Sequence, residues 1–105
     1  MKYKDMVEKI AKTGVSEIER GEMVIRRMAN MIDIILDYKY VVEHYNGGET
    51  STKLADEVNC IKNELAILVS ELDIYMETLC ITDKVKEKAE NRAARILRKI
   101  NQRND

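Results

Sequence analysis

Side chains able to carry out chemistry are few in this chain, and none stands at the spacing that a catalytic or metal site needs. The single histidine, His44, has Tyr40 four residues before it and no Glu or Asp three or four residues away. A general base or a pair of metal ligands on one helix face needs such a neighbour. Carboxylate metal sites of helical bundles use Glu-x-x-His pairs, and the sequence contains none. We therefore expect no catalytic residue and no metal site.

Phosphate binding and thiol chemistry have no stronger support. The glycine-rich stretch Asn46-Gly47-Gly48 is not followed by Gly-Lys-Ser or Gly-Lys-Thr, which a phosphate-binding loop requires. Cys60 and Cys80 lie 20 residues apart in one helical stretch, which is about 30 Å along a helix and too far for a disulfide. We expect two buried thiols in a reducing compartment. From the sequence we therefore expect that the protein is not an enzyme and binds no cofactor.

The composition predicts few, long helices. The 105 residues include no Pro, Phe or Trp and only four Gly, and 45% of them are hydrophobic. Sandwiches and barrels need many tight turns and are excluded, whereas the apolar share suffices for one folded domain. Asp33 and Asp37 interrupt the longest apolar runs, so no membrane span is predicted. The N-terminus has no apolar region typical of a signal peptide, and we expect a cytoplasmic protein.

The predicted organisation is all-α, with two long antiparallel arms that form a helical hairpin, followed by a C-terminal helix. Asn46-Gly47-Gly48 stops a helix and turns the chain, and Thr50, Ser51 and Thr52 are good N-caps for the next helix. The single domain, residues 1–105, is expected to comprise arm 1 (2–45), a turn (46–51), arm 2 (52–81) and a basic C-terminal helix (83–101).

Arm 2 carries a heptad pattern that predicts coiled-coil-like packing. Its seam is expected to contain Leu54, Val58, Ile61, Leu65, Leu68, Leu72, Tyr75 and Leu79. An adjoining apolar row contains Cys60, Ile67, Ile74 and Ile81, so the face is wider than one two-stranded seam buries. A row of glutamates, Glu57, Glu64 and Glu71, repeats every seven residues and is expected on the opposite side, facing water.

Arm 1 keeps one heptad phase from end to end, which favours a continuous helix or a bend. A break near residues 14–21 is the alternative, because Ser16 and Glu19 have the spacing of a capping box. Pairing of the arms across the turn would place Gly21 opposite Tyr75 and Met76. The same pairing would place Gly14 opposite Thr82 and Asp83.

An isolated hairpin would leave several apolar rows bare, which predicts an interface. Those rows contain Cys60, Ile67, Ile74 and Ile81 on arm 2 and Tyr3, Ile10, Val24, Met31 and Tyr38 on arm 1. Two hairpins related by a two-fold axis would form a four-helix bundle, so we expect a homodimer. The alternative is a monomer whose terminal helices fold back over the bare rows.

Charge is segregated along the chain, although the net charge is only −1. Residues 1–45 carry zero net charge, residues 46–81 carry −5 and residues 82–105 carry +4. Segregation of this kind predicts charge complementarity with a partner. The candidate partner-binding residues are Glu57, Glu64 and Glu71 on the acidic side and Arg92, Arg95 and Arg98 on the basic side.

The functional hypothesis is a small protein-interaction module, such as an adaptor, inhibitor or regulator, that binds a protein partner through a helical face. The composition, rich in Lys, Ile, Asn and Glu, is typical of AT-rich bacterial and phage genomes. For that reason the hypothesis includes an origin of the protein in a phage. The alternative is a nucleic-acid-binding regulator that uses the basic C-terminal helix.

Overall fold

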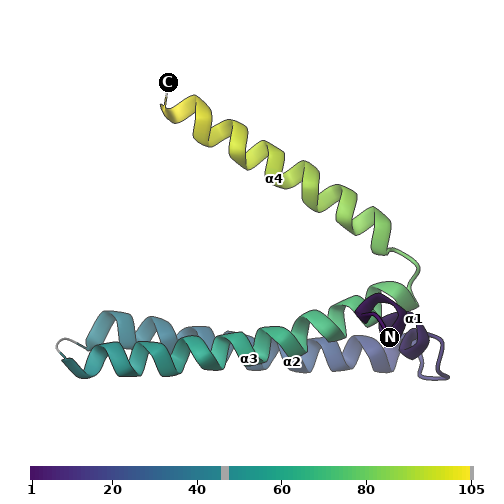
Figure 1. Cartoon of the computed structure of the whole chain (residues 1–105), viewed down its shortest axis with the longest axis horizontal. Coiled ribbons are helices and arrows are strands. Elements are labelled where there is room, and N and C mark those ends of the chain that lie inside the picture. Colours follow the sequence, from purple (N-terminus) through teal and green to yellow (C-terminus); the bar gives the residue numbers. More distant parts are fainter. Residues whose placement is uncertain (46–47, 105) are drawn as a thin grey trace.

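The computed structural model describes the backbone of residues 1–45 and 48–104 and the side chains of residues 1–45 and 52–103. Over these residues the chain is helical and contains no strand, which confirms the predicted all-α class. The helices are α1 (Tyr3–Ala11), α2 (Glu17–His44), α3 (Gly48–Thr78) and α4 (Thr82–Asn104), as Figure 1 shows. Within the described ranges, every helix is too short or too polar to cross a membrane.

The chain breaks between α1 and α2, so the prediction of one continuous helix over arm 1 is wrong. The side-chain oxygen of Ser16, the N-cap of α2, accepts a hydrogen bond from the backbone N–H of Glu19 at 3.1 Å. This bond confirms the capping interaction and satisfies an N–H that has no partner inside the helix. Gly14 lies in the connection with open space around it, so its expected place opposite Thr82 is also wrong.

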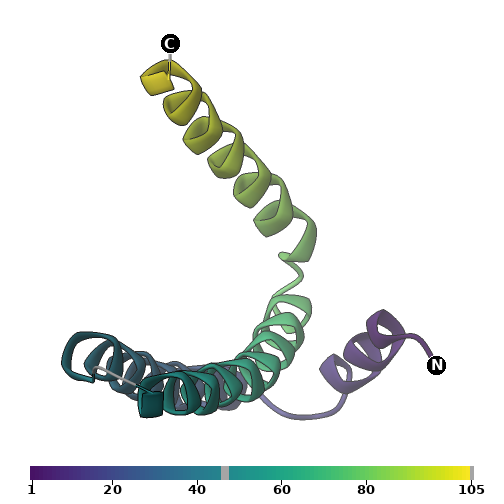
Figure 2. The same ribbon diagram turned by 60° about the vertical axis from the view of Figure 1, so that its left-hand side comes forward.

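The α2 and α3 helices lie side by side along most of their length and run in opposite directions (Figures 1 and 2). Lys53 lies over the ring of Tyr45 at one end of the pair, with its ammonium 4.6 Å from the ring centre. A methyl group on Gly21 would meet the hydroxyl of Tyr75 at 3.4 Å and its ring at 3.5 Å near the other end. The predicted contact between Gly21 and Tyr75 is therefore confirmed.

The core is a thin line of side chains rather than a broad interior. Its buried apolar members are Val7 from α1, Val24, Met31 and Val41 from α2, and Leu68 and Ile74 from α3. The α1 helix packs on α3, and among the described residues α4 contacts the end of α3 alone. The radius of gyration is 17.9 Å, whereas a compact chain of this length has about 13 Å. The molecule is extended because α4 points away from the other helices (Figures 1 and 2).

The boundaries of α3 differ from those predicted for arm 2. Residues 46 and 47 of the expected turn lie outside the described residues, and α3 begins at Gly48. Thr50, Ser51 and Thr52, the expected N-caps, therefore fall inside the helix. Several neighbouring Ser and Thr residues favour a helix start without selecting one position, so the true start lies one turn earlier.

The α3 helix ends in a tight cap at Cys80. The N–H of Ile81 donates to the carbonyl of Met76 at 3.0 Å, and the N–H of Cys80 donates to that of Glu77 at 3.1 Å. These two bonds form a Schellman motif, in which the residue at the position of Cys80 adopts the left-handed conformation. Cys80 has a φ of 58°. Among the described residues it is the one non-glycine residue with a positive φ. The cap directs the chain straight into α4.

Candidate interaction surfaces

The glutamate row of α3 faces α2, so the prediction that Glu57, Glu64 and Glu71 face water is wrong. All three residues are half-buried. The physical reason is helical geometry: at 100° per residue, Glu64 lies only about 40° from Leu68 and about 60° from Ile61. The glutamates therefore border the seam instead of opposing it. Because they pack within the molecule, we do not propose them as a partner-binding face.

Two of these carboxylates are poorly compensated between α2 and α3. Glu64 Oε1 lies 3.6 Å from Arg27 Nη1, and the side chain of Glu64 is 13% exposed. Glu71 Oε2 is buried and has no hydrogen-bond partner among the described residues. Burying an acceptor without a partner costs free energy. The α2–α3 contact is therefore less stable than an apolar seam of the same size.

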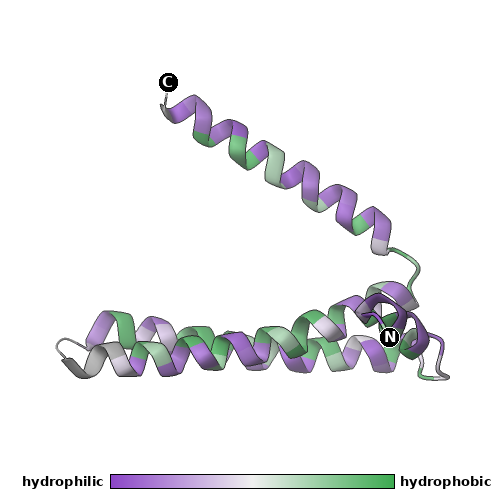
Figure 3. Cartoon of the chain, viewed as in Figure 1, coloured by the Kyte–Doolittle hydropathy of each residue, from purple (hydrophilic) through white to green (hydrophobic). Residues whose placement is uncertain are grey.

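Large apolar side chains line the outside of the α2–α3 pair instead. We define the outer face as the exposed apolar residues on one side of this pair. It contains Ile18, Ile25, Met28, Ile32, Ile35 and Val42 from α2 and Val58 and Leu65 from α3, each 42% to 76% exposed. The recurrence of apolar segments along both helices is visible in Figure 3. Exposed apolar patches of this extent are uncommon on monomeric proteins.

The rows from the two helices come out on the same side of the pair. On α2, a step of four residues toward the C-terminus leads from the buried Met31 to the exposed Ile35. On α3, the same step leads from the half-buried Ile61 to the exposed Leu65. A step of four residues rotates the side-chain direction by about 40° around the helix axis. Because the two axes are antiparallel, this rotation moves the side chains of both helices from the seam toward the same side of the pair. The outer face is therefore one continuous surface.

The basic residues of the C-terminal helix are where the sequence places them, on an exposed helix. Arg92, Arg95 and Arg98 are all exposed on α4. Arg92 and Arg95 line a shallow hollow of about 140 Å³ together with Ile96 and Lys99. Arg98 is not part of this hollow and lies farther round the helix. The structure thus groups Lys99, which the sequence analysis did not select, with two of the three predicted arginines.

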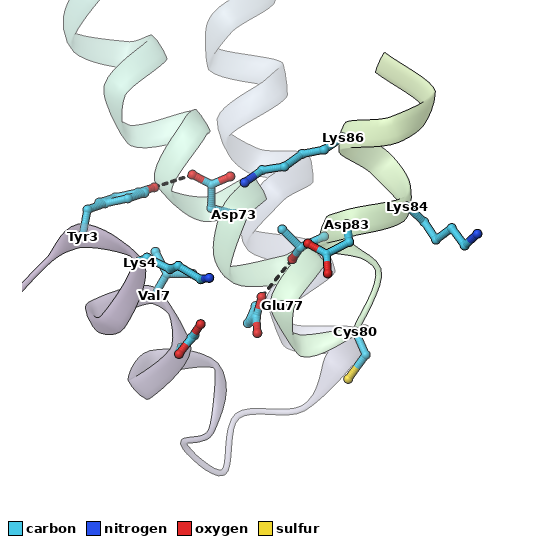
Figure 4. Close-up of a pocket in the computed structure, with 11 residues that line it drawn as sticks. Tyr3, Lys4, Val7, Asp73, Glu77, Cys80, Asp83, Lys84 and Lys86 are labelled. Carbon is cyan, nitrogen blue, oxygen red and sulfur yellow. Dashed lines mark hydrogen bonds between the residues drawn. The ribbon is translucent and has the colours of Figure 1, made fainter. Parts of the chain in front are cut away.

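A larger hollow, of about 500 Å³, lies at the junction of α1, α3 and α4 (Figure 4). Asp73 and Glu77 lie one turn apart on α3, and each accepts a hydrogen bond from a neighbouring helix. The hydroxyl of Tyr3 on α1 donates to Asp73 at 2.5 Å, and the hydroxyl of Thr82 on α4 donates to Glu77 at 2.9 Å. Lys86 extends from α4 toward Asp73 (Figure 4). The junction fixes how α1 and α4 leave α3.

The phenol of Tyr3 is the titratable group that the junction perturbs. Partial burial raises the pKa of Tyr3, and the hydrogen bond to Asp73 raises it further. A hydrogen bond to Ser70 acts in the opposite direction. The proton that Tyr3 donates to Asp73 is thus held more firmly in the folded state.

Arg20 fastens the connection between α1 and α2, and the sequence analysis missed it. Its side chain is buried, and Nη2 donates to the carbonyl of Ile10 at 3.4 Å and to Thr13 Oγ1 at 3.2 Å. These contacts cap the end of α1. The signal available in the sequence was an arginine one turn after the Ser16 cap.

The two cysteines are free and exposed, so the expectation of buried thiols is wrong. Cys60 lies on the exposed part of α3, and Cys80 lies in the turn before α4. In the part of the chain that the structure describes, no three His, Cys, Asp or Glu residues gather as a metal site would require.

Comparison with known proteins found no matching family model, no matching curated protein and no matching solved structure.

Proposed function

We propose that this chain is a non-enzymatic protein-interaction module, an adaptor, inhibitor or regulator, that binds a protein partner through the outer face of α2 and α3. The observation that carries the proposal is the exposure of Ile18, Ile25, Ile32 and their neighbours on one side of the pair. Burial of apolar surface provides the main free energy of protein association. The carboxylates that an acidic docking face would need are packed against α2 instead.

A capture experiment tests the proposal. The tagged chain is incubated with an extract of the organism that encodes it, beside a double variant with Ile32→Asp and Ile35→Asp and a control with Asn30→Asp. Both isoleucines are exposed, so the variant protomer keeps its fold. A protein retained in stoichiometric amount by the wild type and the control, and lost with the double variant, is the expected result. The proposal would be refuted if the double variant retained the same protein as the wild type, or if the wild type retained no protein.

A second candidate is nucleic-acid binding through α4. It is favoured by the hollow in which Arg92, Arg95 and Lys99 surround Ile96, because a cationic stripe on an exposed helix fits a phosphate backbone. Its binding to duplex DNA should weaken as salt rises, with a slope near −0.9 per neutralised phosphate. Replacement of Arg92, Arg95 and Arg98 by Ala should abolish the binding. Absence of retention on DNA or RNA at low salt would eliminate this candidate.

A further inference from the structure

The α4 helix has an apolar stripe of its own that nothing in the described chain covers. Val85, Ile96, Leu97 and Ile100 are 37% to 58% exposed. Ile96 and Ile100 lie one turn apart, and Val85 shares their side at helical spacing. The cations Lys88, Arg92 and Lys99 border one edge of this stripe. The helix is thus amphipathic but has no partner.

The α2–α3 pair as a whole and α4 are opposite in net charge and similar in length. Residues 17–81, which contain α2 and α3, carry a net charge of −7, and residues 82–105 carry +4. Two α2–α3 pairs placed face to face would repel each other through their net negative charge, whereas the basic α4 of one copy is attracted to the α2–α3 pair of another. The 23 residues of α4 span about 34 Å, and the outer face from Ile18 to Val42 spans about 36 Å.

The α4 helix is held away from the outer face of its own chain. The Schellman motif at Cys80 and the bond from Thr82 to Glu77 fix its direction where it leaves α3. In addition, the N–H of Val85 donates to the carbonyl of Ile81 at 3.0 Å, which places the first turn of α4 immediately after the cap. Folding back would break these bonds. The outer face and α4 therefore cannot meet within one chain as it is folded.

The exposed area is large enough for an interface between two copies. The chain exposes 8417 Å², whereas a compact monomer of 12.2 kDa exposes about 6,100 Å². The excess of roughly 2,300 Å² exceeds the roughly 800 Å² that each partner buries in a standard interface. A reciprocal contact, in which each copy gives one helix and accepts one, is the closed two-fold arrangement that most homo-oligomers use.

We infer that the occupant of the outer face is α4 of a second copy, and that two chains exchange their α4 helices reciprocally. This inference rests on the proposed function, because it names the partner of the same surface. It differs from the four-helix pairing of two hairpins, which would leave both α4 helices uncovered. The dimer would contain two equivalent contacts, each between the α4 helix of one copy and the outer face of the other.

Complementation between two variants tests the exchange on the purified full-length chain. The α4 variant carries Ile96→Asp and Ile100→Asp, and the face variant carries Ile32→Asp and Ile35→Asp. All four side chains are exposed, so each protomer keeps its helical content, which circular dichroism verifies. Control variants with Ala94→Asp on α4 or Asn30→Asp on α2 change residues away from both surfaces.

Mass is then measured by light scattering at micromolar concentration. The wild type and both controls should have twice the protomer mass of 12.2 kDa, and each double variant alone should have the protomer mass. An equimolar mixture of the two variants should regain the dimer mass, because the intact α4 of the face variant meets the intact face of the α4 variant.

Three results would overturn the exchange. The first is a monomeric wild type, and the second is a mixture that stays monomeric although the wild type dimerises. The third is an α4 variant that remains dimeric while the face variant dissociates, which is the behaviour of face-to-face pairing. A different protein captured from the extract through the outer face, with a monomeric purified chain, would sink the exchange and leave the proposed function intact.

Discussion

At the scale of single residues, the contact between α2 and α3 is marked by charges where an apolar seam would be more stable. Glu64 is paired with Arg27 at 3.6 Å, but Glu71 has one buried oxygen without a hydrogen bond in the described part of the chain. The glutamate row and the Val58 row both border the row of Ile61 and Leu68, so periodicity alone permits either row as the second half of the seam. The heptad pattern favoured the apolar Val58 row, whereas the fold packs the glutamate row against α2.

Replacing Glu71 by Leu should therefore stabilise the protein. The change removes an acceptor that is desolvated and unpaired, which typically costs about 1–3 kcal/mol. We expect the free energy of unfolding, measured by urea denaturation, to rise by about 1 kcal/mol, since part of the side chain stays in contact with water. Glu64→Leu is the matched control and should gain less, because it leaves Arg27 without its ion pair. A loss of stability for Glu71→Leu would show that the carboxylate has a favourable partner.

The raised pKa of Tyr3 predicts that the packing of α1 on α3 weakens at alkaline pH. Because the folded state raises the pKa of this phenol above its usual value of 10.0, the neutral form is favoured by folding. The resulting stabilisation is fully present below pH 10 and is lost as the pH rises through the folded-state pKa. Phenolate absorbance should show one of the five tyrosines titrating above the unfolded value. The delayed component should vanish in Tyr3→Phe, and its persistence there would assign it to another tyrosine.

At the scale of elements, local signals located one of the helix starts but not the direction in which α4 leaves α3. Ser16 and Glu19 indicated the start of α2 as the alternative to a continuous arm 1, because this cap depends only on residues three apart. The start of α3 was placed too late, since it lies at Gly48 and not at Thr50, Ser51 or Thr52. Gly21 was correctly placed against Tyr75 because pairing across a central turn depends only on residue numbers. The direction of α4 was not predictable, because it depends on a left-handed residue that is not a glycine. Cys80 in that position gives no signal in the sequence.

Cys80→Gly should stabilise the end of α3 without changing the path of the chain. A residue with a Cβ pays roughly 1 kcal/mol or more in the left-handed conformation, and glycine does not. We expect the free energy of unfolding to rise by about 1 kcal/mol and the dimer mass to be unchanged. Cys80→Ala keeps the Cβ and is the control, which should leave stability close to that of the wild type. Equal stability of the Gly and Ala variants would mean that the cap is not formed in solution.

At the scale of the whole molecule, the helical class and the presence of an uncovered apolar surface were predictable from composition and periodicity. The identity of that surface was not. Four adjacent heptad rows on α2 can divide between an inner and an outer contact in more than one way. The fold places Val24 and Met31 inside and Ile18, Ile25 and Ile32 outside, whereas the sequence analysis expected Val24 and Met31 to remain bare.

The salt dependence of self-association is the most direct test of the central claim that the outer face of the net-acidic α2–α3 pair receives the basic α4 helix of a second copy. The measurement is the dissociation constant of the wild-type chain by sedimentation at two ionic strengths. Between about 0.1 M and about 1 M salt, the screening length falls from roughly 10 Å to roughly 3 Å. We predict a dimer at low salt whose dissociation constant rises at high salt, because screening weakens the attraction between charges of −7 and +4. A monomer at both salt concentrations, or a dimer that tightens as salt rises, would contradict the claim.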